Sequence, residues 1–123
     1  MKYVFYKKEV FRSDLENPTR TAYIWVDKEQ GAKHVSGGSV DIPAKSELAY
    51  HSHEKEEEIM FVCKGRGVAI VEGVSYPVEP ETMVFVPPGL KHQFKNTGSE
   101  SLSIAWFYAP PGPEQGVRIA AKK

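Results

Sequence analysis

Residues 51–65 read His51-Ser52-His53-Glu54-Lys55-Glu56-Glu57-Glu58-Ile59-Met60-Phe61-Val62-Cys63-Lys64-Gly65, and this stretch decides both fold and chemistry. Two histidines one residue apart on a strand point to the same side, because side chains alternate with period two. A second stretch, residues 87–96, reads PPGLKHQFKN and adds a third histidine, His92. Three of the four histidines thus fall in these stretches, where a nearby carboxylate would complete a set of nitrogen and oxygen ligands for a divalent metal.

The residues alone leave open which glutamate joins the histidines. One face of the expected strand carries the more apolar alternate residues, which are Ile59, Phe61 and Cys63. If that face is the inner one, Glu57 points inward with it. Glu58 is instead in phase with Met60 and Val62 on the opposite face.

Short segments rich in β-branched and aromatic residues alternate with turns along the rest of the chain. The expected strands cover residues 21–26, 34–42, 48–53, 58–64, 68–71, 74–78, 83–86, 92–95 and 102–108. The segment 34–42 contains paired glycines that indicate a bend or bulge. Glu72-Gly73 fits a two-residue hairpin turn. Residues 10–16 are expected to form a short helical turn, and the proline-rich tail near Pro110 to be a surface extension. This succession of short strands and turns, without a convincing long helix, predicts an all-β antiparallel sandwich or barrel.

Length and composition predict one ordinary globular domain spanning residues 1–123. Hydrophobic residues make up 41% of the chain and charged residues 26%. Sixteen basic and sixteen acidic residues cancel, without a basic tract, so we expect no nucleic-acid partner. We also expect no membrane partner, because no apolar segment approaches the roughly 18 residues of a membrane span. The apolar run at the N-terminus is too short for a signal sequence, and a single cysteine, Cys63, fits a reducing compartment, so the expected location is cytoplasmic.

The spacing of these residues resembles the two motifs of the cupin superfamily, in its small single-domain (monocupin) form. The first motif is matched by His51, His53, Glu58 and Gly65. The second motif is matched by Pro87, Gly89, His92 and Asn96. Two positions depart from the pattern, because Lys45 and Glu81 stand where the family has turn glycines. These departures affect the loops and leave every ligand position filled.

The resemblance implies a double-stranded β-helix, or jelly-roll barrel, that binds one divalent transition metal. The implied ligands are His51, His53, Glu58 and His92, so the family spacing selects Glu58 over Glu57. The donor set suits iron, manganese, nickel, zinc or copper. The resemblance further implies an enzyme of the dioxygenase, isomerase or lyase type that uses the metal as a Lewis acid on a small oxygenated molecule. Two alternatives stay open: a metal-dependent module that binds or senses a small molecule without chemistry, and a structural protein with a vestigial site.

Residues outside the two motifs supply further expectations. The candidates for acid–base chemistry near the metal are His34, Glu47 and Tyr50, although His34 also fits an ordinary surface residue. Choosing Glu58 turns Ile59, Phe61 and Cys63 away from the metal, so we expect them to face a second buried surface, supplied by a homodimer. Cys63 is accordingly expected to be a small buried hydrophobe. The large aromatic residues are expected in the core or the interface; they are Tyr23, Trp25, Tyr50, Trp106 and Tyr108.

Overall fold

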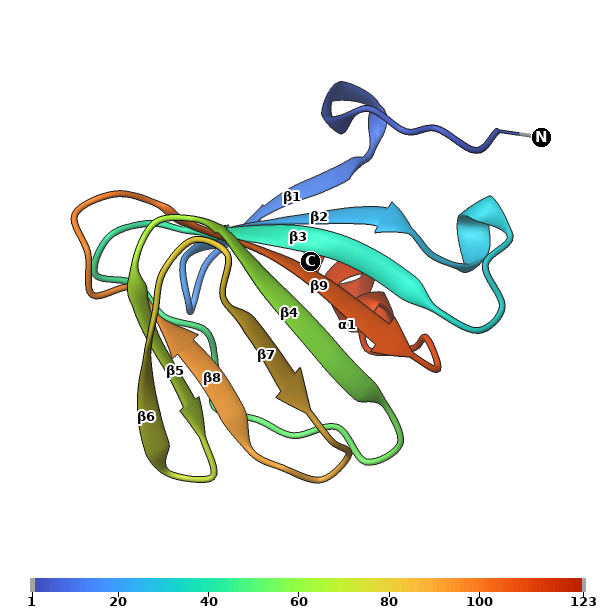
Figure 1. Ribbon diagram of the computed structural model, residues 1–123. Helices are drawn as coiled ribbons and strands as arrows, with labels where there is room; N and C mark the ends of the chain where they lie inside the picture. The colour runs from blue at the N-terminus through green and yellow to red at the C-terminus, as the bar shows by residue number, and fades with distance from the viewer. Residues whose placement is uncertain (1, 123) are drawn as a thin grey trace.

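Two antiparallel β-sheets face each other in the computed structural model, which describes residues 2–122 (Figure 1). The strands found in this range are β1 (Phe11–Leu15), β2 (Arg20–Val26), β3 (Ser36–Ile42), β4 (Glu57–Lys64), β5 (Gly67–Val71), β6 (Val74–Val78), β7 (Met83–Val86), β8 (His92–Lys95) and β9 (Leu102–Ala109). The larger sheet has the order β1-β2-β3-β9-β4-β7 and the smaller sheet the order β6-β5-β8. Two 3₁₀ turns, Lys7–Glu9 and Lys28–Gln30, and one helix, α1 (Glu114–Ala121), complete the described chain. The all-β jelly-roll fold predicted from the sequence is confirmed.

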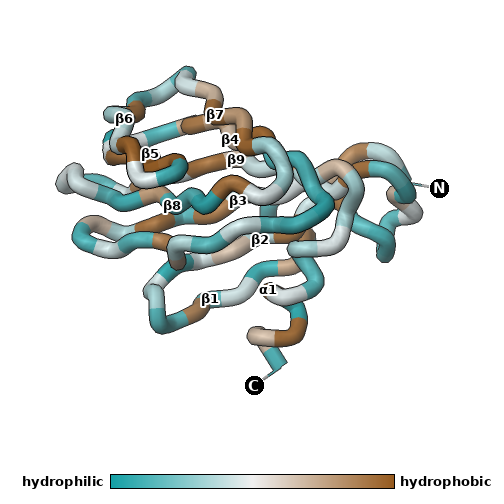
Figure 2. Tube along the Cα trace, turned by 90° about the horizontal axis from the view of Figure 1, so that it is seen from below, coloured by the Kyte–Doolittle hydropathy of each residue, from teal (hydrophilic) through white to brown (hydrophobic). Residues whose placement is uncertain are grey.

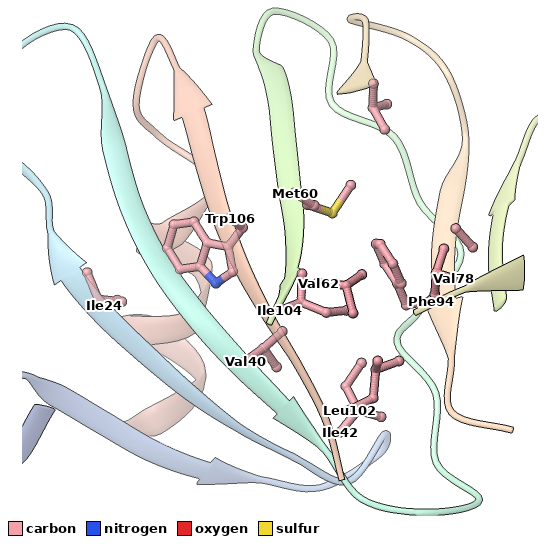
Figure 3. Packing of buried hydrophobic residues seen from close by; sticks show 12 residues of the cluster. Ile24, Val40, Ile42, Met60, Val62, Val78, Phe94, Leu102, Ile104 and Trp106 are labelled. Atoms are coloured by element: carbon pink, nitrogen blue, oxygen red, sulfur yellow. The ribbon is translucent and has the colours of Figure 1, made fainter. Parts of the chain in front are cut away.

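The core lies between the two sheets and is made by the inward-facing alternate residues of each strand (Figure 3). Val62 on β4 and Leu102 and Ile104 on β9 are completely or almost completely buried. Phe94 on β8 meets them from the smaller sheet (Figure 3). Each of these side chains contributes about 2 kcal/mol of transfer free energy, so the closed sandwich is the state that the hydrophobic pattern favours.

The paired glycines of β3 have a packing role. A Cβ atom added at Gly38 would collide with the indole of Trp106 and with the Tyr23 carbonyl oxygen. The strand itself is continuous from Ser36 to Ile42, and the register shift lies opposite it, between Ile24 and Val26 of β2. The expected irregularity is therefore present, but it lies on the neighbouring strand.

The helical turn predicted for residues 10–16 is wrong, because this segment forms β1. Its side chains alternate between the two faces: Phe11 packs against the core and Leu15 is buried, whereas Arg12 is exposed. The strand pairs in register with β2, from Phe11 opposite Ile24 to Leu15 opposite Arg20. The alternation of buried and exposed side chains over these five residues thus favours a strand, despite the neighbouring residues that favour a turn.

The strand predicted for residues 48–53 is replaced by an extended segment with isolated bridges. Leu48 N donates to Phe94 O at 2.9 Å. His51 and His92 exchange two backbone hydrogen bonds, of 3.1 and 2.8 Å. The segment therefore follows β8 without forming a continuous ladder.

The C-terminal tail is more ordered than predicted, because it forms the helix α1, which packs against β1. Arg118 of this helix forms a salt bridge with the fully buried Asp27, with Nε donating to Oδ2 at 2.8 Å and Nη2 to Oδ1 at 3.1 Å. Gln115 donates to the same carboxylate at 3.0 Å. The proline-rich segment is a short connection to this helix.

The turns bear out the local expectations. Val71 pairs with Val74, and Glu72 and Gly73 both have positive φ, so the predicted two-residue hairpin is confirmed. Lys45 and Glu81 each have φ of 68°, although neither is glycine. The turns keep the left-handed conformation that the glycine positions of the family imply, at a cost of about 1 kcal/mol each.

Candidate metal centre

Four predicted ligand side chains meet at one end of the barrel. His51 and His53 lie on the extended segment before β4, Glu58 on β4 and His92 at the start of β8. The Nε2 atoms of His51 and His53 are 3.1 Å apart. Glu58 Oε1 lies 2.9 Å from His92 Nε2 and 3.6 Å from His53 Nε2. One ligand atom from each histidine lies within 4.8 Å of those of the other two. The structure therefore brings together all four residues named from the sequence.

Backbone contacts explain this convergence. The double hydrogen bond between His51 and His92 places their rings side by side, with centroids 4.5 Å apart. Gly89 N donates to His53 O at 2.7 Å, and Gly89 has φ of 88°, a conformation that favours glycine. The proline-glycine turn of the second motif thus fixes the position of His53 in the first.

Glu58 and Glu57 have opposite environments. Glu58 is 4% exposed and points inward with Met60 and Val62, whereas Glu57 is exposed. The inner face of β4 is therefore the one that the family spacing indicates. The more apolar set of alternate residues, Ile59, Phe61 and Cys63, which would have selected Glu57, lies on the outer face of β4.

Hydrogen bonds to carbonyl groups fix the histidine tautomers in a way that fits a metal. His51 Nδ1 lies 2.6 Å from Ala49 O, and His92 Nδ1 lies 2.9 Å from Leu90 O. A carbonyl oxygen only accepts, so each Nδ1 carries the proton and donates it. The Nε2 atoms then face the centre, where they meet one another and the Glu58 carboxylate. A proton on His92 Nε2 satisfies its contact with Glu58, and a divalent transition metal, which this donor set suits, can take the place of that proton.

The pKa values of the clustered groups are shifted in different directions. Burial lowers the pKa of His51 below its ordinary value, which keeps this imidazole neutral. Burial also opposes protonation of His92, but the Glu58 carboxylate and the Leu90 carbonyl outweigh it and raise the His92 pKa. Burial acts to raise the pKa of Glu58, and the neighbouring His53 and His92 outweigh it, so this pKa is lowered. Glu58 is therefore held ionised, as a metal ligand must be.

A cavity of about 300 Å³ opens next to the four ligands and is of the size that holds one small molecule. Its walls include Trp106 and Tyr108 of β9, Met60 of β4 and Arg20 of β2. The C-terminal helix closes another side with Glu114 and neighbouring residues, which are Pro113, Gly116 and Val117. The cavity is thus built from the barrel interior and from α1 together.

Tyr108 is a site residue that sequence reasoning assigned only to the core or the interface. Its ring packs edge-on against His53, with centroids 5.1 Å apart, and it lies opposite Glu58 in the pairing of β4 with β9. Burial and the Glu58 carboxylate raise the pKa of Tyr108 well above its ordinary value, so the phenol stays protonated. The alternation of β9, with Leu102, Ile104 and Trp106 inward, already turns Tyr108 to the same side.

The three acid–base candidates named from the sequence lie elsewhere. His34, Glu47 and Tyr50 are exposed, and the cavity walls within residues 2–122 do not include them. Glu47 accepts a hydrogen bond from Gln93 at 3.0 Å and lies 3.7 Å from Lys95 Nζ, at the surface. The titratable groups that do line the cavity beyond the four ligands are Arg20, Tyr108 and Glu114.

The outer face of β4 is apolar and uncovered. Ile59 lies between Phe85 of β7 and Phe107 of β9 in the strand register, and these three side chains are 39%, 54% and 45% exposed. Figure 2 shows hydrophobic stretches on all three strands. Cys63 is exposed on the same face, so the prediction that it is buried in this chain is wrong.

Comparisons with known proteins agree with this geometry. The family model described as "Cupin domain" matches residues 38–108, which is more than half of the chain and contains all four ligand positions. The chain belongs to the cupin family. The first and second motifs, with the ligand positions that the resemblance implied, lie inside the matched region.

Individual cupins resemble the chain over part of its length. An oxalate-binding protein of Thermotoga maritima is 33% identical over 63 residues, covering 51% of this chain and 52% of that protein. A glucose-6-phosphate isomerase of Pyrococcus abyssi is 36% identical over 73 residues, covering 54% of this chain and 39% of the isomerase. The chain spans less than two thirds of the length of the curated relatives that it matches.

The fold of this cupin is shared with solved structures. The crystal structure of a predicted oxalate decarboxylase from Thermotoga maritima superposes with a TM-score of 0.78 at 23% identity, covering 89% of this chain and all of that one. At this identity the likeness concerns the fold. In residues 2–122 no helix has both the length and the apolar character needed to span a membrane.

Proposed function

We propose that this cupin is a metal-dependent enzyme that acts on a small oxygenated organic molecule. The observation that carries the proposal is the set of four convergent side chains, His51, His53, Glu58 and His92, whose ligand atoms meet beside a cavity of about 300 Å³. The implied metal is iron, manganese, nickel, zinc or copper. Bound there, it would supply Lewis-acid chemistry by polarising an oxygen atom of the bound molecule.

The protein groups around the centre support such chemistry. The Nδ1–H groups of His51 and His92 are held by backbone carbonyls, which fixes the orientation of both rings. Trp106 and Met60 line the cavity with apolar surface and limit the access of water. Tyr108 keeps its proton at Oη, packs against His53 and lies opposite Glu58 in the strand register, so it provides a protonated hydroxyl in the cavity wall. We propose that Tyr108, rather than His34, Glu47 or Tyr50, contacts the substrate.

A second candidate is a module that binds a small molecule without converting it. This alternative is favoured by the exposed positions of His34, Glu47 and Tyr50, which leave the cavity without a free carboxylate or imidazole beyond the ligand set and Glu114. The relative from Thermotoga maritima that is named an oxalate-binding protein supports the same alternative.

Elemental analysis of the purified protein tests the metal centre. We expect near-stoichiometric transition metal in the wild-type protein and in the His34→Ala variant, whose histidine is exposed and outside the cavity. We expect none in His92→Ala, which loses a buried ligand. A wild-type protein that contains no metal and also rejects added metal would contradict the proposal.

Turnover assays on the metal-loaded protein then separate the two candidates. Conversion of a small hydroxy or oxo compound that is lost in Tyr108→Phe, with metal content unchanged, supports the enzyme. Tight binding of the same compounds with no product in wild-type protein supports the binding module.

A further inference from the structure

Arg20 is the unusual residue of the cavity. It is the first residue of β2 and, like Ala22 two positions later, it lines the cavity wall together with the four ligand residues. The side chain is half-buried. Among the described residues, it is the one lysine or arginine in this wall.

The guanidinium of Arg20 has no carboxylate partner among residues 2–122. Its recorded hydrogen bond runs from Nη1 to Pro18 O, at 2.7 Å. Burial lowers the pKa of Arg20, and no nearby acid offsets this loss of hydration. The other three arginines of the chain each have an acidic partner: Arg12 with Asp14, Arg66 with Glu79 and Arg118 with Asp27. A partly desolvated charge without a partner is costly, so such groups usually meet an anion.

The two carboxylates of the cavity are already engaged. Glu58 contacts His53 and His92. Glu114 accepts hydrogen bonds from Ser36 Oγ at 2.5 Å, from Gly112 N at 3.0 Å and from Gln115 Nε2 at 2.9 Å. Neither forms a salt bridge with Arg20. With a divalent ion bound, the metal and Arg20 would together exceed the negative charge of Glu58 and Glu114, and the cavity would favour an anion.

We propose that Arg20 binds the anionic end of the ligand, a carboxylate or a phosphate, while other oxygen atoms of the same molecule face the metal centre. An arginine presents a planar fork of N–H donors that matches both groups. The cavity volume limits the ligand to a small acid or phosphate ester. The part of this inference that concerns the metal rests on the proposed function, whereas the anion-binding role of Arg20 does not.

Isothermal titration calorimetry with matched probes tests the inference. The probes are glycolate, inorganic phosphate and glycolamide, the neutral analogue of glycolate, added to the protein as purified with its metal content measured. We expect wild-type protein to bind at least one of the two anions more tightly than glycolamide. In Arg20→Gln the affinity for that anion should fall about 10- to 100-fold, because a hydrogen bond to a charged group is lost, with metal content unchanged.

Two further variants sharpen the test. Arg66→Gln removes an arginine from the exposed turn after β4 and should leave anion binding unchanged. Arg20→Lys keeps the positive charge but loses the planar set of N–H donors, so we expect an anion affinity between those of wild-type protein and Arg20→Gln. If Arg20→Gln does not fold, a reduced anion affinity in Arg20→Lys supports the role of Arg20, and an unchanged affinity contradicts it.

The outcomes separate the two proposals. Equal anion affinities in wild-type protein and Arg20→Gln, or no preference of wild-type protein for either anion over glycolamide, would overturn the role of Arg20 and leave the metal centre intact. A wild-type protein that contains no metal and rejects added metal, but loses anion affinity in Arg20→Gln, would support the role of Arg20 and contradict the metal-dependent function.

Discussion

At the residue scale, the neighbours Glu57 and Glu58 provide a matched pair, because they differ in environment and share the same chemistry. Glu58→Gln keeps the size of the side chain and removes the charge that faces the histidines. We expect its metal affinity to fall by at least about 100-fold, since losing a direct ligand should cost more than the roughly 10- to 100-fold lost when a residue that only hydrogen-bonds to a ligand is changed. Glu57→Gln should bind metal like wild-type protein, because Glu57 is exposed. Competition with a chromophoric chelator measures both, and equal affinities would contradict the ligand set.

The ligand residues could be named from the sequence because the cupin motifs fix them by spacing along the chain. His51 and His53 share a segment, and their convergence with His92 follows from two motifs that can be read without the fold. Arg20 and Tyr108 could not be named in the same way. Their place in the cavity depends on strand neighbours far away in sequence: Tyr108 lies opposite Glu58, 50 residues earlier, through the pairing of β4 with β9.

At the scale of elements, the buried Asp27–Arg118 salt bridge ties α1 to the end of β2. Asp27→Asn removes the charge and leaves Arg118, 13% exposed, without its main partner. We expect the free energy of unfolding at pH 7 to fall by about 3 kcal/mol. Because Glu114 and Val117 of α1 also line the cavity, ligand binding should weaken in the same variant.

The pH dependence follows from the lowered pKa of Asp27. Burial acts to raise this pKa, but hydrogen bonds from Arg118, Glu29 N and Gln115 outweigh it. A carboxyl group whose folded-state pKa is depressed stabilises the protein above its unfolded pKa of about 4, and this contribution is lost as the pH falls through the folded value. The stability difference between wild-type protein and Asp27→Asn, from urea unfolding at pH 7, 5 and 3, should therefore shrink at pH 3. A constant difference would contradict this account, and Glu79→Gln, in an exposed pair, should change stability little throughout.

Most strands could be predicted because period-two alternation and turn residues mark them locally. The two elements that were missed depend on distant partners. The helix α1 has eight residues and follows three prolines at 110, 111 and 113, and it gains its stability from Asp27 and from packing on β1. The strand β1 is equally short, and its identity is decided by pairing with β2.

At the scale of the whole molecule, the homodimer stays a prediction, and the outer face of β4 is where we expect it. The exposed side chains of Ile59, Phe85 and Phe107 are adjacent in the strand register, and apolar patches of this kind mark interaction surfaces. Sedimentation equilibrium should give twice the chain mass of 13.8 kDa for wild-type protein. Phe107→Lys should shift the mass to that of a monomer, whereas Tyr76→Lys, at an exposed aromatic on the smaller sheet, should not. A wild-type monomer would contradict the homodimer.

The position of the cavity walls relative to the family match affects how function can be transferred between cupins. The match spans residues 38–108 and contains the metal ligands, whereas Arg20 precedes it and α1 follows it. Two cupins with the same motifs can thus share a metal and differ in the parts that select the substrate. We expect a homologue of this chain to bind the same substrate only if it also has an arginine at the start of β2 and an equivalent C-terminal helix. Residue 20 and residues 113–117 are therefore the positions by which to sort its relatives into groups of common specificity.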